Sequence, residues 1–335
     1  MELELYHPPI NCYLHHAYPL TVAMSHKDFY AWLFSNYIQL EYFDRSKTLN
    51  FLTYPICGTD SLCPLIDYKR LDLEFIYKSN IDIFDFIKTS INLGYYVVTY
   101  TDEFYIPERI SYVNKTHFRH DIMIYGYDSD KSLFNVIGYN EKLKYASSCV
   151  SFSEFESSFL NSIDKTNDII LMKAKDSNSY NPFYEFDIEN VKNLLSDYLF
   201  SKNTSANYRS LGKPNDSISG ISVYSQLIKY YQNILQNNNN NNERCDVKHF
   251  HLLYEHKKTM VSRLQYLIEN KYINPKSDFI SIFHNLENEA LNKRNVIMKY
   301  NATKNKSQIN TIIDSLHKMC ESEIRAMEAL LNALN

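Results

Sequence analysis

The hydrophobic positions in the first half of the chain change between helical and strand-like spacing. Residues 81–92 (IDIFDFIKTSIN) place their large apolar side chains near one face of a helix. Residues 95–101 (YYVVTYT) are an unbroken β-branched and aromatic run, which predicts a central strand. Residues 13–42 are rich in aromatic side chains and mostly compatible with helix, and residues 169–173 (IILMK) predict a further short strand. The first half is therefore predicted to mix helices and strands.

A β-hairpin is predicted at the centre of this region. Residues 120–127 (HDIMIYGY) and residues 133–139 (LFNVIGY) both alternate between apolar and polar positions. The five residues between them, 128–132 (DSDKS), are polar and typical of a turn. This pairing is antiparallel, so the first sheet is expected to be antiparallel at least here.

The spacing of the hydrophobic positions in the second half of the chain predicts helices throughout. Composition shifts near residue 176, where residues 176–182 (DSNSYNP) form a polar linker, and the asparagine run at 237–242 is expected to be a loop. Helices are predicted at 191–199, 222–235, 247–270, 276–292 and 307–334. We therefore expect an α+β fold in two domains: residues 1–176 with an antiparallel sheet, and residues 177–335 all-helical.

Composition excludes several classes of protein. The net charge of −4, from 35 basic and 39 acidic residues, gives no basic excess of the kind that nucleic-acid binders show. With only 6 glycines, the chain contains neither GxGxxG nor GxxxxGK[ST], the commonest phosphate-binding loops. The 6 cysteines form no CxxC pair, so we expect no metal site. Without an apolar leader or a membrane-spanning run, we expect a cytoplasmic protein with no membrane or nucleic-acid partner.

Two sequence contexts suggest nucleophilic chemistry. Cys12 follows Asn11 directly before a helix-compatible stretch, and a helix N-terminus favours a thiolate and offers N–H groups to an oxyanion. His120 begins a predicted strand about 100 residues later, the order in which papain-like thiol enzymes carry their nucleophile and base. A cysteine or histidine in such a place more often has only a packing role. His15, His16 and His117 are equally available bases.

A third residue is expected to orient the imidazole. With the hairpin turn centred near Asp130, Asn140 faces His120, and an asparagine carbonyl can hold the imidazole tautomer as a carboxylate does. Asp102 ends the preceding strand and is an alternative orienting residue, or a group on the oxyanion side.

The region 95–144 resembles the N-terminal domain of the butirosin biosynthesis protein H family. In that family a strand ends in Asp-x-x-Tyr-x-Pro, matched here by residues 102–107 (DEFYIP), and a histidine opens a strand that runs to Gly-Tyr-Asp, matched by residues 120–128. The family nucleophile often occurs as Asn-Cys, as at residues 11–12. Bacteriocin-leader-processing cysteine peptidases share the Cys and His parts of this pattern.

The second half is similar to the helical C-terminal domain of the same family, through residues 221–231, residues 252–267 and Glu323 in the last helix. One departure concerns the triad. Where the family commonly places its aspartate this chain has Gly138, so either Asn140, on the same strand face, takes that role or the site is a Cys-His dyad.

The resemblance implies a papain-like acyltransferase of nonribosomal-peptide-like secondary metabolism. Cys12 would take an acyl group from a thioester on the phosphopantetheine of an acyl or peptidyl carrier protein, and His120 would deprotonate an incoming small amine to form an amide. No ATP or metal is implied, because thioester aminolysis runs downhill. Asp102 and Tyr105 are the implied substrate-binding residues. Glu103 adds to a negative site for a cationic amine, and Tyr13, Tyr18 and Phe104 are further candidate pocket residues.

Two other functions remain open from the sequence. A cysteine peptidase or amidase would use the same groups with water as the acceptor, and a non-catalytic scaffold would explain Gly138. The helical domain is expected to cover the acyl channel or to dock the acidic carrier protein. Its candidate contact residues are Lys257, Lys258, Arg263, Lys293 and Arg294.

Overall fold

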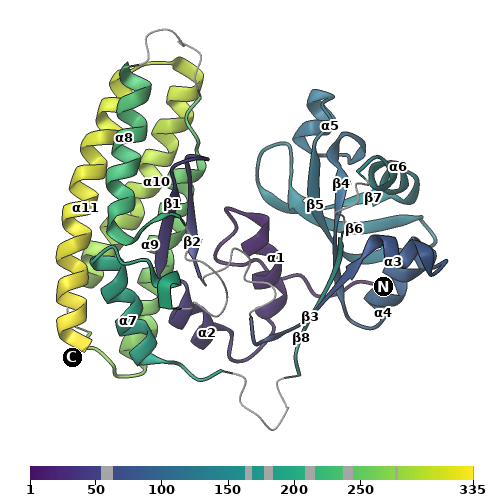
Figure 1. Ribbon diagram of the computed structural model, residues 1–335, viewed down its shortest axis with the longest axis horizontal. Helices are drawn as coiled ribbons and strands as arrows, with labels where there is room; N and C mark the ends of the chain where they lie inside the picture. Colours follow the sequence, from purple (N-terminus) through teal and green to yellow (C-terminus); the bar gives the residue numbers. More distant parts are fainter. Residues whose placement is uncertain are drawn as a thin grey trace. The chain divides into compact units, whose positions relative to one another are not determined.

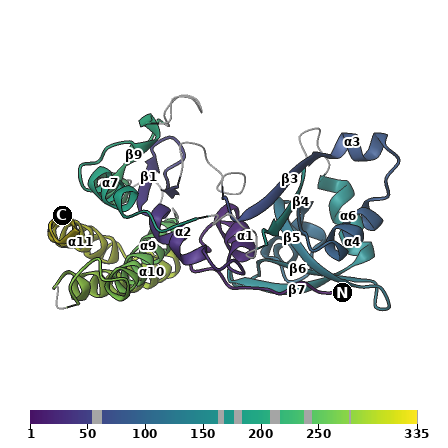
Figure 2. The ribbon, with the colours of Figure 1, turned by 90° about the horizontal axis from the view of Figure 1, so that it is seen from below.

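A computed structural model of the chain shows a mixed α and β protein with two compact units (Figures 1 and 2). It describes residues 1–53, 63–162, 168–176, 184–207, 216–236, 244–275 and 278–334. The sheet unit comprises Met1–Phe29 and Asp60–Phe183, and the helical unit comprises Tyr30–Thr59 and Tyr184–Asn335. Each unit is described by itself below.

The sheet unit is built on six antiparallel strands in the order β3-β8-β4-β5-β6-β7. The strands are β3 (Ile66–Asp72), β4 (Tyr96–Asp102), β5 (Arg119–Asp128), β6 (Leu133–Tyr139), β7 (Tyr145–Ser151) and β8 (Asp168–Ala174). β4, β8 and the β5–β6 hairpin confirm the strands predicted from the sequence. The Asp128 carboxylate closes the hairpin turn, because it accepts the backbone N–H groups of Asp130 and Lys131, each at 3.1 Å.

Helices cover both faces of this sheet (Figure 2). One face packs on three helices through a core in which Val97, Ile122 and Phe134 are buried. Side chains alternate along a strand, so the neighbouring positions face the other way, toward the buried helix α1 (Leu14–Ala23). The three helices of the first face are α3 (Leu73–Lys78), α4 (Ile83–Asn92) and α6 (Phe152–Ser162).

Helix α4 confirms the helix predicted at 81–92, and its ends have clear causes. The Asp82 carboxylate accepts the backbone N–H of Asp85 at 2.9 Å, which satisfies one of the donors that a helix start leaves free. Gly94 follows the helix with a φ of 85°, a left-handed conformation that favours glycine. The turn then leads directly into β4.

The helical unit contains long helices and a small sheet. Its helices are α2 (Phe29–Asn36, of which Phe29 falls in the sheet unit), α7 (Ile188–Leu199), α8 (Val223–Gln236), α9 (Lys248–Glu269), α10 (Phe279–Thr303) and α11 (Ser307–Leu334). Its antiparallel sheet has the order β2-β1-β9, formed by β1 (Gln39–Phe43), β2 (Thr48–Leu52) and β9 (Ile218–Ser219). The five helices predicted after residue 176 are therefore present, and α10 extends past its predicted end.

Buried charges of α9 explain why residues 30–53 belong with the helical unit. The Arg263 side chain has no exposed surface, and its guanidinium donates to the C=O groups of Phe34 and Tyr37. These carbonyls lie at the C-terminal end of α2, where helix C=O groups lack intrahelical partners and a cation is favourable. His256 Nε2 lies 2.8 Å from the C=O of Ile38 and completes the attachment.

A second buried charge group joins α9 to α11. Lys257 Nζ forms an ion pair with Glu323, and neither side chain has exposed surface. The other oxygen of Glu323 accepts the hydroxyl of Tyr224 at 2.7 Å, so both carboxylate oxygens have donors. Burial lowers the pKa of Lys257, while the Glu323 charge acts in the opposite direction. A buried ion pair of this kind depends on both partners being present.

Two sequence expectations about the domains are corrected. The part after residue 176 is not all-helical, because β9 completes a sheet with β1 and β2. Residues 30–53, assigned to the first domain, pack with the helical unit through α9. The end of the predicted helix-compatible stretch 13–42 is in fact strand β1. The asparagine run at 237–242 and linker residues 177–182 lie outside the described residues, as do 54–55 and 276–277.

Candidate active site

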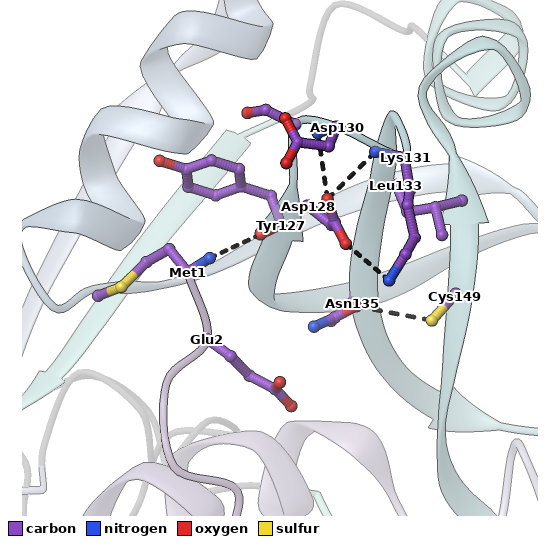
Figure 3. A pocket seen from close by; sticks show the side chains of 10 residues that line it. Met1, Glu2, Tyr127, Asp128, Asp130, Lys131, Leu133, Asn135 and Cys149 are labelled. Carbon is purple, nitrogen blue, oxygen red and sulfur yellow. Dashed lines mark hydrogen bonds and ion pairs between the residues drawn. The ribbon is translucent and has the colours of Figure 1, made fainter.

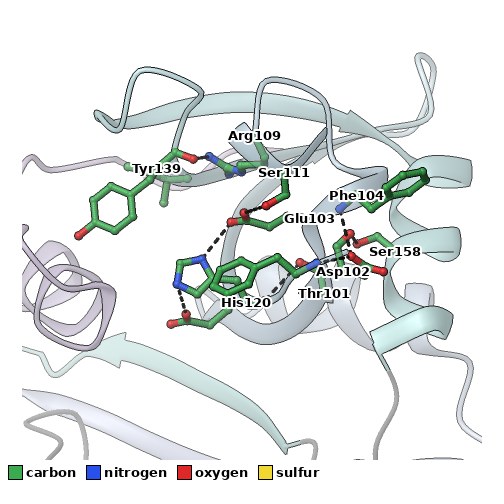
Figure 4. A network of polar contacts seen from close by, with 12 residues as sticks. Thr101, Asp102, Glu103, Phe104, Arg109, Ser111, His120, Tyr139 and Ser158 are labelled. Carbon is green, nitrogen blue, oxygen red and sulfur yellow. Dashed lines mark hydrogen bonds and ion pairs between the residues drawn. The ribbon is translucent and has the colours of Figure 1, made fainter. Parts of the chain in front are cut away.

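His120 lies at the beginning of β5, and a carboxylate holds its ring. Nδ1 of His120 is 2.9 Å from Oε1 of Glu103, which belongs to the 3₁₀ turn η1 (Glu103–Tyr105) after β4 (Figure 4). The other oxygen of Glu103 accepts the hydroxyl of Ser111 at 3.2 Å, and Glu103 is buried. A carboxylate in this position fixes the imidazole with its proton on Nδ1, which leaves Nε2 as the basic nitrogen.

Asn140, the predicted orienting residue, has a different role. The strand register pairs Met123 with Ile137, and β6 ends at Tyr139, before Asn140. Oδ1 of Asn140 accepts the backbone N–H groups of Lys142 and Lys144, each at 3.0 Å, and so stabilises the turn after β6. The prediction that Asn140 orients His120 is therefore wrong, because Glu103 holds Nδ1 of His120 instead.

Asp102, the alternative orienting residue and predicted substrate-binding residue, pairs with another histidine. Its Oδ2 lies 2.7 Å from Nδ1 of His117, and its Oδ1 accepts the N–H groups of Phe104 and Phe118, each at 3.1 Å. Burial acts to raise the pKa of Asp102, but these hydrogen bonds outweigh it and hold the pKa below its usual value. Asp102 thus fastens both ends of the loop that begins with Glu103.

The predicted pocket aromatics of η1 pack on this second pair. The rings of Phe104 and His117 are stacked with their centroids 4.3 Å apart, and the Tyr105 ring packs edge-on against Phe104 at 5.0 Å. Tyr105 is half-buried. The described contacts of Tyr105 are thus those of a packing residue, and its substrate-binding role stays a prediction.

Gly138, where the resembling family has an aspartate, lies against a buried guanidinium. A Cβ at this position would be 3.0 Å from Nη2 and 3.2 Å from Cζ of Arg109, whose side chain is 2% exposed. Nη1 of Arg109 donates to the C=O of Tyr139 at 2.9 Å. Arg109 therefore occupies the space of a side chain at 138, and the acid beside His120 comes from η1 instead.

Cys12 directly precedes the N-cap residue of α1, Tyr13, and is a buried thiol, 3% exposed. The Tyr139 hydroxyl donates to the C=O of Asn11, which ties the Cys12 segment to the end of β6. The backbone N–H groups of His16 and Ala17 donate to the C=O of Tyr13, so the first turn of α1 closes directly after Cys12 and its positive dipole end lies beside the Cys12 segment.

Helix α1 is also fixed to the strand that carries His120. The Tyr18 hydroxyl lies 3.2 Å from the C=O of Asp121 and 3.1 Å from that of Ile137. Asp121 Oδ1 lies 3.5 Å from Nε2 of His120. Burial raises the pKa of Asp121, although the charges of His120 and His15 act in the opposite direction. His15 and Asp121 line the same small cavity, so α1 lies beside the end of β5 that carries His120.

A cavity lies at the other end of β5, beside the hairpin turn (Figure 3). This cavity of about 560 Å³ is lined by the hairpin turn and by Asn135 and Cys149. The Asp128 carboxylate there is held by turn N–H groups and by Lys131 Nζ at 3.0 Å, and Cys149 Sγ lies 3.5 Å from Asn135 Oδ1. None of the residues that line this cavity is a histidine, so it lacks the imidazole that a Cys-His site requires.

The role of Glu103 beside His120 was not predicted from the sequence. Arg109 and Ser111 were not predicted to lie at the site at all. A signal for Glu103 exists, because antiparallel pairing of two successive strands places Thr101 opposite His120, and Glu103 follows two residues later. Arg109 and Ser111 have no comparable signal, since only the folded loop brings them to the site.

Comparison with known proteins gives no family. No protein-family model matches the chain, and no curated protein matches it. Among the described residues, no helix combines the length and the apolar character needed to cross a membrane. Within the same ranges, no three His, Cys, Asp or Glu side chains are grouped so as to hold a metal ion.

Proposed function

We propose that the chain is a cysteine-dependent acyltransferase of papain-like type, with Cys12 as nucleophile, His120 as base and Glu103 as the positioning residue. The observation that carries this proposal is the 2.9 Å contact between Glu103 Oε1 and His120 Nδ1, at the end of the sheet where Tyr139 holds the Cys12 segment. The donor is an acyl thioester on the phosphopantetheine of a carrier protein, and the acceptor is a small amine.

The first half-reaction transfers the acyl group to sulfur. Nε2 of His120 takes the Cys12 proton, and the thiolate attacks the thioester carbonyl to give a tetrahedral oxyanion. The positive end of the α1 dipole, directly after Cys12, stabilises the oxyanion, and Glu103 stabilises the imidazolium without taking its proton. The intermediate collapses, the pantetheine sulfur leaves with the proton from His120, and the acyl group remains on Cys12.

The second half-reaction forms the amide. The amine attacks the Cys12 thioester while His120 Nε2 takes its proton, and the Cys12 sulfur then leaves with that proton. An amine competes with water at this step, and the low exposure of Cys12, 3%, favours a bound acceptor over solvent. A peptidase or amidase would use the same groups with water as acceptor, so product analysis distinguishes the two.

The expected carrier-protein contacts need revision. Lys257 and Arg263 have no exposed surface and cannot meet a partner. Lys293 pairs with Glu289 at 3.2 Å, and Arg294 Nη1 lies 3.0 Å from His251 Nδ1. Of the five candidates only Lys258 is exposed, so the charge argument for docking on α9 and α10 is weak.

Intact-protein mass spectrometry with an acyl-loaded carrier protein tests the proposal. The natural chain and the Cys149→Ala variant, which lacks an exposed thiol, should both gain the acyl mass, and Cys12→Ala should not. Adding an amine should then release amide rather than free acid. Acylation of Cys12→Ala at the natural rate would refute the nucleophile, and equal free-acid yields with and without amine would favour a hydrolase.

A further inference from the structure

A small cavity adjoins the candidate active site on the α1 face of the sheet. It has a volume of about 100 Å³, and its apolar walls include Leu14, Val98 and Ile170. Two carboxylates, Asp121 and Asp168, also line it. A space of this size admits an aliphatic chain of a few carbon atoms, since a water molecule's share of liquid is about 30 Å³.

The strand register places the two carboxylates on either side of Tyr100. Asp121 on β5 pairs directly with Tyr100 on β4, and Asp168 is the first residue of β8, the strand on the other side of β4. Because β4 lies between β5 and β8 and neighbouring strands are about 4.8 Å apart, the backbones that carry the two aspartates are at least about 10 Å apart. Tyr100, Asp121 and Asp168 line the same cavity; burial raises the pKa of Tyr100, the two aspartate charges add to that effect, and Arg119 and Arg70 oppose it.

Each carboxylate already has a partner of a different kind. Asp121 Oδ1 lies 3.5 Å from His120 Nε2, so a residue that lines the cavity contacts the proposed base. Asp168 forms an ion pair with Arg70, whose side chain is 66% exposed. Arg119 lies over the Tyr100 ring, with Cζ 3.9 Å from its centroid. An exposed ion pair such as that of Arg70 is weak, so a ligand cation can replace it at little cost.

We propose that this cavity is the acceptor subsite and that it selects a short aliphatic diamine. The inference rests on the proposed acyltransferase function. The apolar walls contact the methylene chain, Asp168 binds the distal ammonium, and the reacting amine lies beside Asp121 and Nε2 of His120, which takes its proton. A monoamine lacks the contact with Asp168. An α-amino acid would bring its own carboxylate close to two others, which is unfavourable.

Direct binding tests the subsite independently of catalysis. Titration calorimetry of the full-length Cys12→Ala variant would compare 1,4-diaminobutane with 1-aminobutane, which has the same carbon chain and one ammonium fewer. We expect the diamine to bind about tenfold more tightly, as for one added charge-assisted contact. Adding Asp168→Asn should remove that preference, while Asp130→Asn, the same change in the exposed hairpin turn, should keep it. Equal affinities for the two amines, or a preference that survives Asp168→Asn, would overturn the inference.

Aminolysis of the acylated natural chain separates the two proposals. If Cys12 takes the acyl group and 1,4-diaminobutane releases it at a lower concentration than 1-aminobutane, both are supported. If Cys12 is acylated but the two amines act equally, the subsite is refuted and the acyltransferase stands. If Cys12 is never acylated while the calorimetric preference persists, the acyltransferase is refuted and the diamine site stands.

Discussion

The carboxylate of Glu103 bridges His120 Nδ1, at 2.9 Å, and the hydroxyl of Ser111, at 3.2 Å. Glu103→Gln keeps the size and one acceptor but removes the charge that stabilises the imidazolium. We expect the rate constant for acylation of Cys12 to fall about a hundredfold. The thioester concentration that gives half of the maximal rate should change less than about threefold. Single-turnover mass spectrometry measures both quantities.

The matched control for this change is Glu108→Gln, the same substitution at an exposed position of the same loop. It should leave the acylation rate within about twofold of the natural value. Glu103→Asp should recover part of the rate lost in Glu103→Gln. A Glu103→Gln variant with full activity would show that Glu103 does not position His120 for catalysis.

Asn140 should matter for the turn after β6 and little for the reaction. Asn140→Ala removes the acceptor of the Lys142 and Lys144 N–H groups. We expect a loss of about 0.5–1.5 kcal/mol in local stability, seen as faster hydrogen exchange at these two amides, with the acylation rate within about twofold. A hundredfold loss of rate without faster exchange would return Asn140 to the role of orienting residue.

The hairpin, the central strand β4 and the five C-terminal helices were predictable, because their signals are local. The apolar stripe of α11, from Ile309 to Leu334, defines a helix without reference to any other segment. The turn at Asp128 is likewise local, since the carboxylate binds N–H groups two and three residues ahead. Such elements need no tertiary contact to be recognised.

Other features were not predictable, because they depend on residues far apart in the sequence. The sequence predicted that Lys257 and Arg263 are charges at the surface. Their partners, Glu323 and Phe34, lie on other helices and make their burial possible. The role of Glu103 depends on a 3₁₀ turn that aims its side chain back across the strand pair. Periodicity describes one element at a time and cannot supply these pairings.

The buried pair of Lys257 and Glu323 predicts a large stability effect. Glu323→Ala leaves the Lys257 ammonium buried without its carboxylate, which should lower the free energy of unfolding by about 3–5 kcal/mol. Trp32 is the single tryptophan of the chain and is buried in the helical unit, so its fluorescence during urea unfolding reports on this unit.

The control for the ion pair is Lys258→Ala, at the adjacent exposed position, which should change the stability by less than about 0.5 kcal/mol. The double variant Lys257→Met with Glu323→Leu should recover most of the loss, because apolar side chains of similar volume can replace a buried ion pair. A Glu323→Ala variant as stable as the natural chain would contradict the buried pair.

Buried histidines should make the helical unit sensitive to acid. Burial lowers the pKa of His256 and of His249 below the usual value of about 6.5, so the unfolded chain binds more protons than the folded chain as the pH falls below that value. Stability is therefore retained above about pH 6.5 and lost below it, by up to about 1.4 kcal/mol per pH unit for each histidine.

Urea unfolding followed by Trp32 fluorescence at pH 7, 6 and 5 measures this dependence. His256→Gln should make the loss of stability between these pH values less steep, because one titrating group is removed. His317→Gln, a change of an exposed histidine on α11, should leave the pH dependence as it is. Identical pH dependence for the natural chain and His256→Gln would refute the burial of a neutral His256.

The path of the chain through its two units constrains how the protein can be divided and made. The chain leaves the sheet unit after Phe29, contributes α2, β1 and β2 to the helical unit, and returns to form β3. A fragment ending at residue 176 would carry α2, β1 and β2 without the α9 side chains that bind Phe34 and Ile38 just before β1, and the complementary fragment would lack both strands. During synthesis, residues 30–53 are made before α9, so the β1–β2 hairpin has to wait for its α9 contacts, and a separable sheet unit requires excision of this segment rather than truncation.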